Sequence, residues 1–145
     1  MRIAECGLRN FPAMKNEDLK LRTKQFALRV IRLSGAMPRT IAGDVLSRQI
    51  VRSATSVAAN YRSACRAKSR ADFIAKMGIV EEEADESAFW LELIAETEML
   101  AVAKTEALLR EANELTVVAV ASIRTARGGT RSATPHSAFL TPQSK

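Results

Sequence analysis

The sequence predicts an all-α protein, an antiparallel up-and-down four-helix bundle in a single domain. Helix-breaking residues avoid the middle of the 145-residue chain: of its six glycines and four prolines, six lie before residue 13 or after residue 127. Between those ends, apolar residues recur at alternating steps of three and four, which is the spacing of one face of a helix. Four such stretches with short connections bury their apolar stripes best against one another.

The first two helices follow from their start and stop signals. Asn16, followed by two acidic residues, is a suitable first cap, and Pro38 ends the first helix. Thr40 can cap a second helix that runs to about Ala67. The inward stripe of the first helix is Leu19, Thr23, Phe26, Val30, Leu33 and Met37, and that of the second is Leu46, Ile50, Ser53, Val57, Asn60 and Ala64.

The last two helices are expected on either side of a short break near residues 102–104. Ser69 with Asp72 three residues later resembles a capping box that begins the third helix. The fourth helix runs from about Thr105 to Arg127 and stops at two glycines. The third stripe is Phe73, Met77, Val80, Ala84, Ser87, Leu91 and Ala95, and the fourth is Leu108, Ala112, Leu115, Ala119 and Ile123. We therefore expect a bundle over residues 16–127, a loose lead-in over 1–15 and a disordered tail over 128–145.

Charge divides the chain into two parts. Residues 17–70 carry twelve Lys and Arg against three Asp and Glu, whereas residues 71–145 carry seven against twelve. The N-terminus lacks the apolar core of a signal peptide, and no apolar run is long enough to span a membrane. The two cysteines lie far apart in the sequence. We expect a cytoplasmic protein with reduced thiols and no membrane association.

A second stripe on the predicted second helix lies opposite its apolar stripe. It consists of Arg48, Arg52, Thr55, Ala59, Arg62 and Arg66, and Lys68 and Arg70 continue it past the helix end. Arginine supplies a fixed fork of donors that suits phosphate, so the six basic residues are candidates for binding RNA or DNA. The alternative is a solvated face that pairs with the acidic third helix. Without aromatic residues in this stripe, we expect no base stacking there.

The third helix carries more apolar surface than one core needs. Phe89 and Leu93 point roughly opposite Leu91, and Trp90 lies between them. A helix that is apolar on several sides is usually covered on several sides, so Phe89, Trp90 and Leu93 are predicted to form an interface with another copy or another protein. The alternative is that one of the terminal segments folds over them.

Polar residues in or beside the core stripes also need partners. They are Ser53, Ser56, Asn60, Glu83 and Glu86, with Arg52 within reach. The simplest interpretation is a network between helices that fixes their register, and a ligand pocket is the alternative. We expect no catalytic site, cofactor or metal: the only histidine, His136, lies in the tail, and no phosphate-binding loop, nucleophile motif or Cys–His pair is present.

Several of these residues resemble a known family. The pairs Arg52-Ser53, Ser56-Val57, Asn60-Tyr61 and Arg66-Ala67, the run over residues 69–73 and the run over residues 83–93 resemble the two signatures of the four helix bundle proteins, also called 23S rRNA-intervening-sequence proteins. Phe26-Ala27 fits the first helix of that family, and the resemblance covers about residues 16–125. The chain departs from the family at Ser63, where Glu is common.

The resemblance implies a four-helix bundle assembled into a homopentameric ring. It also implies kinship with the accessory proteins of diversity-generating retroelements, which bind nucleic acid and a reverse transcriptase. We therefore expect a non-enzymatic oligomer that binds RNA or DNA non-specifically and has a reverse transcriptase or ribonucleoprotein as a possible partner. The alternative function is a protein-interaction scaffold in which the arginine stripe serves subunit or partner contacts.

Overall fold

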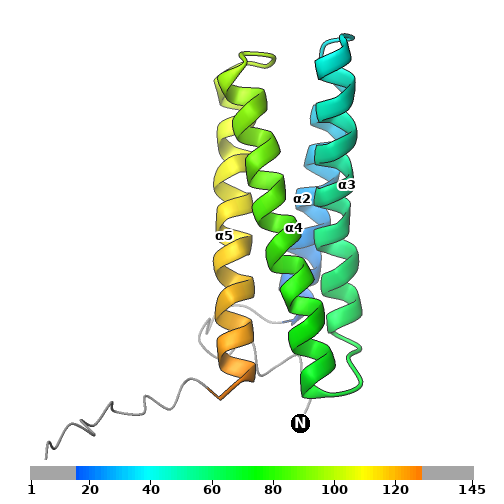
Figure 1. The fold of residues 1–145 in the computed structure, drawn as a ribbon, viewed down its shortest axis with the longest axis vertical. Coiled ribbons are helices and arrows are strands. Elements are labelled where there is room, and N and C mark those ends of the chain that lie inside the picture. The colour runs from blue at the N-terminus through cyan, green and yellow to red at the C-terminus, as the bar shows by residue number, and fades with distance from the viewer. Residues whose placement is uncertain (1–15, 129–145) are drawn as a thin grey trace, which may run out of the picture.

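The computed structural model describes residues 16–128, which form four helices that run alternately up and down (Figure 1). They are α2 (Asn16–Gly35), α3 (Ile41–Ala64), α4 (Arg70–Glu96) and α5 (Val102–Ala126). The described residues contain no strand. The predicted all-α, four-helix fold is therefore confirmed. The predictions for residues 1–15 and 129–145 lie outside the described residues.

Two of the three predicted caps form as expected. The third prediction is wrong: Asn16 is the first residue of α2, and its buried Oδ1 has no hydrogen-bond partner in the described part of the chain. Thr40 Oγ1 accepts a hydrogen bond from the Gly43 N–H at 3.0 Å, and Ser69 Oγ accepts one from the Asp72 N–H at 3.0 Å. The Asp72 carboxylate reaches one residue further back than in a capping box and accepts the Lys68 N–H at 3.0 Å. This backbone hydrogen bond, with the ammonium group of Lys76, lowers the pKa of Asp72.

The helix ends differ from the predicted ones in three places. Helix α2 ends at Gly35, before the predicted end at Pro38. Helix α3 ends at Ala64, three residues before the predicted Ala67, and the break between α4 and α5 falls at residues 97–101 instead of 102–104. Helix α4 ends where Glu98 adopts a φ of 56°, with the Glu98 N–H bonded to the Ala95 carbonyl at 3.1 Å and the Met99 N–H bonded to the Ile94 carbonyl at 3.3 Å. A non-glycine residue in the left-handed region gives no sequence signal comparable to a C-terminal glycine.

The predicted stripes form most of the core, with two exceptions. Asn60 is only half-buried, and Tyr61 takes the inward place at 2% exposure. Likewise Ala95 is half-buried while Ile94 is fully buried. In both cases the larger apolar side chain of two neighbours faces inward, because its burial removes more apolar area from water. Burial also raises the pKa of the Tyr61 hydroxyl.

The bundle closes between its first and last helices. Helices α2 and α5 pack least closely of the neighbouring pairs. Arg22 on α2 joins them, with its Nε 2.6 Å from Glu111 Oε1 and its guanidinium also bonded to Glu114. None of the four helices has the length and apolarity that a bilayer span requires.

Candidate nucleic-acid interface

The basic stripe predicted on the second helix is divided in the structure. Arg48, Arg62 and Arg66 are exposed on α3, Lys68 is exposed in the turn after it, and Arg70 is exposed at the start of α4. Within residues 16–128, none of these five side chains takes part in an ion pair. Five of the six predicted nucleic-acid-binding residues thus present uncompensated positive charge to solvent.

Arg52 is the sixth, and it is occupied within the chain. Its Nη1 lies 3.2 Å from Glu83 Oε1 and its Nη2 lies 2.6 Å from Glu86 Oε1, both on α4. These hydrogen bonds, first to Glu86 and then to Glu83, raise the pKa of Arg52. The bond from Arg52 is also the main reason that the pKa of Glu86 is lowered. Arg52 therefore belongs to the contact between α3 and α4 as much as to the basic surface.

A groove runs between α2 and α3, open to solvent, with a volume of about 740 Å³. We call it the α2/α3 groove. Apolar side chains in its lining are Leu21, Ala27, Leu28, Ala58 and Ala59, and basic ones are Lys20, Lys24, Arg62 and Arg66. The sequence analysis missed its α2 half. The signal was there, since Leu21 and Leu28 are seven residues apart and off the inward stripe of that helix.

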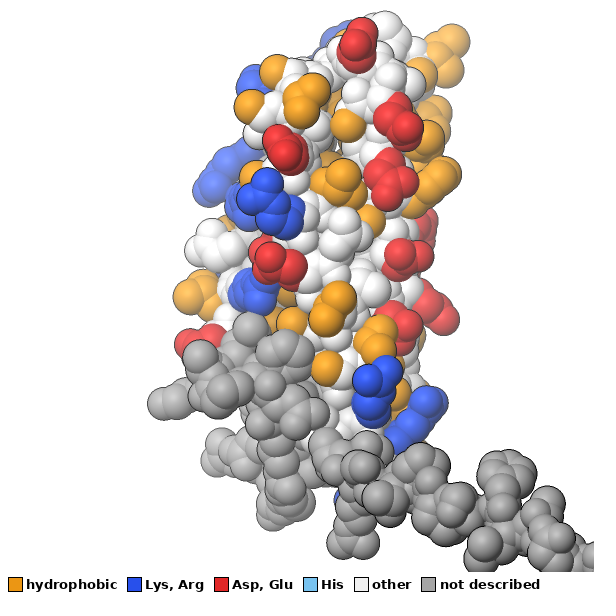
Figure 2. Space-filling view, turned by 90° about the vertical axis from the view of Figure 1, so that its left-hand side faces the viewer, with side chains coloured by type: hydrophobic (Ala, Val, Ile, Leu, Met, Phe, Trp, Pro, Cys, Tyr) orange, Lys and Arg blue, Asp and Glu red, His pale blue; other side chains and the backbone are white. Residues whose placement is uncertain are grey.

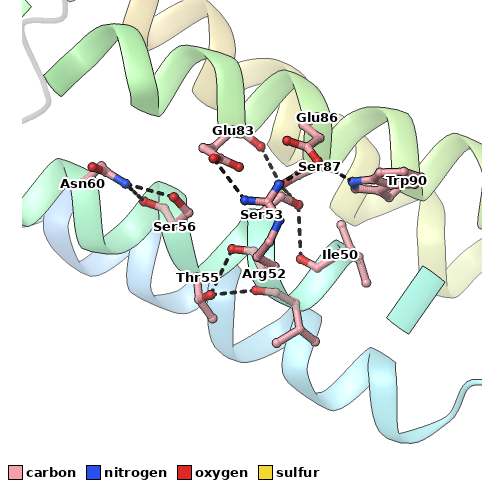
Figure 3. A network of polar contacts seen from close by, with 11 residues as sticks. Ile50, Arg52, Ser53, Thr55, Ser56, Asn60, Glu83, Glu86, Ser87 and Trp90 are labelled. Carbon is pink, nitrogen blue, oxygen red and sulfur yellow. Dashed lines mark hydrogen bonds and ion pairs between the residues drawn. The ribbon is translucent and has the colours of Figure 1, made fainter. Parts of the chain in front are cut away.

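A buried hydroxyl contact joins α3 and α4 at their centre (Figure 3). Ser53 Oγ and Ser87 Oγ lie 2.9 Å apart, and both residues are fully buried. Each hydroxyl also lies within hydrogen-bonding distance of a carbonyl on its own helix, Ser53 of Ile50 at 3.3 Å and Ser87 of Glu83 at 2.8 Å. Two small side chains at this position let the helices approach closely while leaving no hydroxyl unpaired.

The other predicted polar residues separate into two groups. Glu83 and Glu86 bind Arg52, and Glu86 Oε1 also accepts the indole N–H of Trp90 at 3.1 Å (Figure 3). Asn60 bonds only to its own helix, to the carbonyl and hydroxyl oxygens of Ser56, both at 2.9 Å. The structure thus brings Ser53, Glu83 and Glu86 to the α3–α4 contact and leaves Ser56 and Asn60 apart. The sequence analysis did not assign Ser87 or Trp90 to this contact.

The predicted interface residues lie on the outer side of α4. Phe89 is 49% exposed, and its ring packs edge-on against Trp90 with centroids 5.0 Å apart. Trp90 and Leu93 are half-buried and pack against the core.

Glu82, Asp85 and Glu92 are exposed on the same helix. We call Glu82, Asp85, Phe89, Glu92 and Leu93 the α4 ridge. Figure 2 shows acidic and hydrophobic side chains following one another down one edge of the molecule.

No group of three or more His, Cys, Asp or Glu side chains within residues 16–128 is arranged to hold a metal ion. Cys65 is a half-buried free thiol whose pKa is raised, first by burial.

These features define the class of protein: an antiparallel four-helix bundle with a basic α2/α3 side, an acidic α4 and a polar contact between its two central helices. The chain belongs to the family of 23S rRNA-intervening sequence proteins, whose model matches residues 15–120. It is also similar to a solved protein of unknown function from the S23 ribosomal protein family of Bacteroides thetaiotaomicron. That structure is 36% identical and superimposes with a TM-score of 0.70, covering 77% of this chain and 99% of that chain. No curated protein matches the chain significantly.

Proposed function

We propose that the protein is a non-enzymatic, cytoplasmic, oligomeric bundle that binds RNA or DNA without sequence preference. The observation that carries this proposal is the set of exposed cations without ion pairs in the described residues, Arg48, Arg62, Arg66, Lys68 and Arg70. Each can neutralise a phosphate and release a counterion, which supplies affinity whatever the base sequence. The family name, which refers to an intervening sequence of ribosomal RNA, supports RNA as the first ligand to test.

The homopentamer implied by the family resemblance belongs to the same proposal. A ring would present the basic surface once per subunit, and simultaneous contacts raise affinity without any new type of contact. A reverse transcriptase or another ribonucleoprotein component is a partner that this arrangement could accommodate. Apolar surface left exposed on α4, with Phe89 at its centre, supports assembly with another chain.

The test is a salt titration of RNA binding by the double variant Lys68→Glu/Arg70→Glu. We expect its affinity to fall on the order of tenfold at low salt, and the slope of log affinity against log salt to fall by about one per lost phosphate contact. The control is Lys104→Glu/Arg110→Glu, which makes the same change in net charge at exposed residues of α5. Absence of binding by the unmodified protein at low salt, or an equal loss in the control, would contradict the proposal.

A protein-interaction scaffold is the second candidate, and the ion pairs of Arg52 with two α4 carboxylates favour it. They demonstrate that arginines of α3 have suitable partners on α4. If the remaining arginines bind carboxylates of a neighbouring subunit, Arg62→Glu/Arg66→Glu should dissociate the assembly. Light scattering distinguishes the two functions: a variant that stays assembled but no longer binds RNA would exclude the scaffold.

A further inference from the structure

The α2/α3 groove combines two properties that suit a protein helix. Its floor is apolar and made of small or aliphatic side chains, including Ala58, Ala59 and Leu28, so another helix can approach closely. Its rim carries Lys24, Arg62 and Arg66, none of which has an ion-pair partner within residues 16–128. Of the side chains that the structure describes, none in the lining is an aromatic on which a base could stack.

The α4 ridge has the complementary properties. Phe89 is an exposed aromatic anchor, and its orientation is restrained by Trp90, whose indole is held by Glu86. Asp85 precedes Phe89 by four residues and Glu92 follows it by three, so one carboxylate lies about one turn to either side. Together with Glu82, these carboxylates have no ion-pair partner in the described part of the chain.

We propose that the α2/α3 groove of one subunit receives the α4 ridge of a second copy of this chain. Phe89 enters the apolar floor, and Glu82, Asp85 and Glu92 pair with Lys24, Arg62 and Arg66. Charges without an ion-pair partner among residues 16–128 then find one across the interface. The proposal rests on the assembly stated in the proposed function. It assigns Arg62 and Arg66 to the subunit contact and leaves Arg48, Lys68 and Arg70 as the cations for nucleic acid.

The lengths of the two surfaces agree. The α2 side of the groove runs from Glu17 to Leu28, and the ridge runs from Glu82 to Leu93. At 1.5 Å per residue, each of these eleven-residue steps spans about 16 Å. Groove and ridge lie on different helices of one chain, so the contact is head-to-tail. A head-to-tail contact forms a ring when its rotation closes.

Two variants remove one surface each and leave the other intact. Phe89→Ala removes the anchor of the ridge. Ala59→Glu places a carboxylate among the groove cations, and the isosteric Ala59→Gln is its matched control. Both positions are exposed, so we expect the bundle to fold, which circular dichroism checks. By light scattering, each of the two disruptive variants should lower self-association at least tenfold, because truncating an interface anchor commonly has such an effect.

The decisive measurement mixes the two variants. Phe89→Ala retains a competent groove and Ala59→Glu retains a competent ridge, so an equimolar mixture should form a 1:1 dimer of about twice the 15.9 kDa chain mass. Ala107→Glu, at an exposed α5 alanine outside both surfaces, should assemble like the unmodified protein.

Three results would overturn the inference: unchanged assembly of both variants, no complementation in the mixture, or an unmodified protein that is monomeric. If Ala59→Glu stays assembled but binds RNA more weakly, the groove holds RNA instead of a subunit. A monomeric unmodified protein would also remove the oligomeric part of the proposed function, whereas failure of either disruptive variant or of the mixture would leave that function intact. The Lys68→Glu/Arg70→Glu titration tests nucleic-acid binding separately, because it concerns cations outside the groove and is measured independently of assembly.

Discussion

The α3–α4 contact and the α2–α5 contact both join antiparallel neighbours, but different kinds of polar group hold them. The first has a buried pair of hydroxyls, Ser53 and Ser87, at its centre, and Arg52 with two carboxylates at its edge. The second relies on the part-buried Arg22, which binds Glu111 through two nitrogens and also binds Glu114, between helices that pack less closely.

The comparison indicates that the two contacts contribute differently to the fold. A buried hydrogen bond between two small residues favours one alignment of two helices, since a shift would break the bond that joins them. A partly exposed ion pair tolerates small shifts and contributes little, because solvent and salt screen it. The α3–α4 contact also holds Glu86 and thereby Trp90 behind the exposed Phe89, the anchor of the subunit contact that we propose.

The largest effect is expected from breaking the α3–α4 contact with Ser87→Leu. The longer side chain has no room where the two hydroxyl oxygens lie 2.9 Å apart, and Ser53 keeps only the carbonyl of Ile50 on its own helix as a partner. The free energy of unfolding should fall by about 3 kcal/mol, the upper part of the usual range for overpacking. Urea denaturation followed by circular dichroism measures it. The control Ser87→Ala should lower it by about 1 kcal/mol, and equal values for the two variants would refute the close-approach explanation.

A smaller effect is expected from Arg22→Ala at the α2–α5 contact. Removing the bonds to Glu111 and Glu114 should lower the free energy of unfolding by about 1 kcal/mol or less. The difference from the unmodified protein should shrink at 1 M salt, where screening acts over about 3 Å. Lys20→Ala removes a local surface pair within α2 and should have a smaller effect still. If Arg22→Ala lowered the free energy of unfolding as much as Ser87→Leu does, the two contacts would contribute equally to stability and the distinction between them would fail.

The smallest effect on stability is expected when the pH is lowered and Glu86 takes up a proton. The hydrogen bonds from Arg52 and Trp90 lower the pKa of Glu86 from its ordinary 4.5. The unfolded chain therefore takes up this proton first as the pH falls, so the stabilisation is complete above about pH 4.5 and is lost as the pH falls through the lowered pKa. Titration of the Glu86 carboxyl carbon by NMR should show the lowered value. Arg52→Ala should return it towards 4.5, and an unchanged value in that variant would remove Arg52 as the cause.

Local signals made most of the fold predictable. Thr40 and Ser69 act within three residues of their own positions, and the apolar stripes depend only on helical spacing. The break before α5 was misplaced because Glu98 ends the helix in a conformation that its residue type does not favour. Tyr61 replaced Asn60 in the core because burial selects the larger apolar group of two candidates.

The candidate site was less predictable, because it depends on which helices become neighbours. The spacing of the basic stripe could not show that Arg52 alone would reach Glu83 and Glu86, since these lie 31 and 34 residues further along the chain. The α2/α3 groove also depends on which helices become neighbours. Leu21 and Leu28 stand off the inward stripe of α2 in the sequence, but they form a floor with Ala58 and Ala59 only when α2 and α3 pack together.

An even number of antiparallel helices places the start of α2 and the end of α5 at the same pole of the bundle (Figure 1). The four helices could therefore follow one another in a different order along the chain and still pack in the same way. A short linker could join those two ends while new termini open in the turn between α4 and α5, at residues 97–101. Such a circular permutant would keep every contact within the bundle and would move its termini to the opposite pole, away from the cations of the α3–α4 turn.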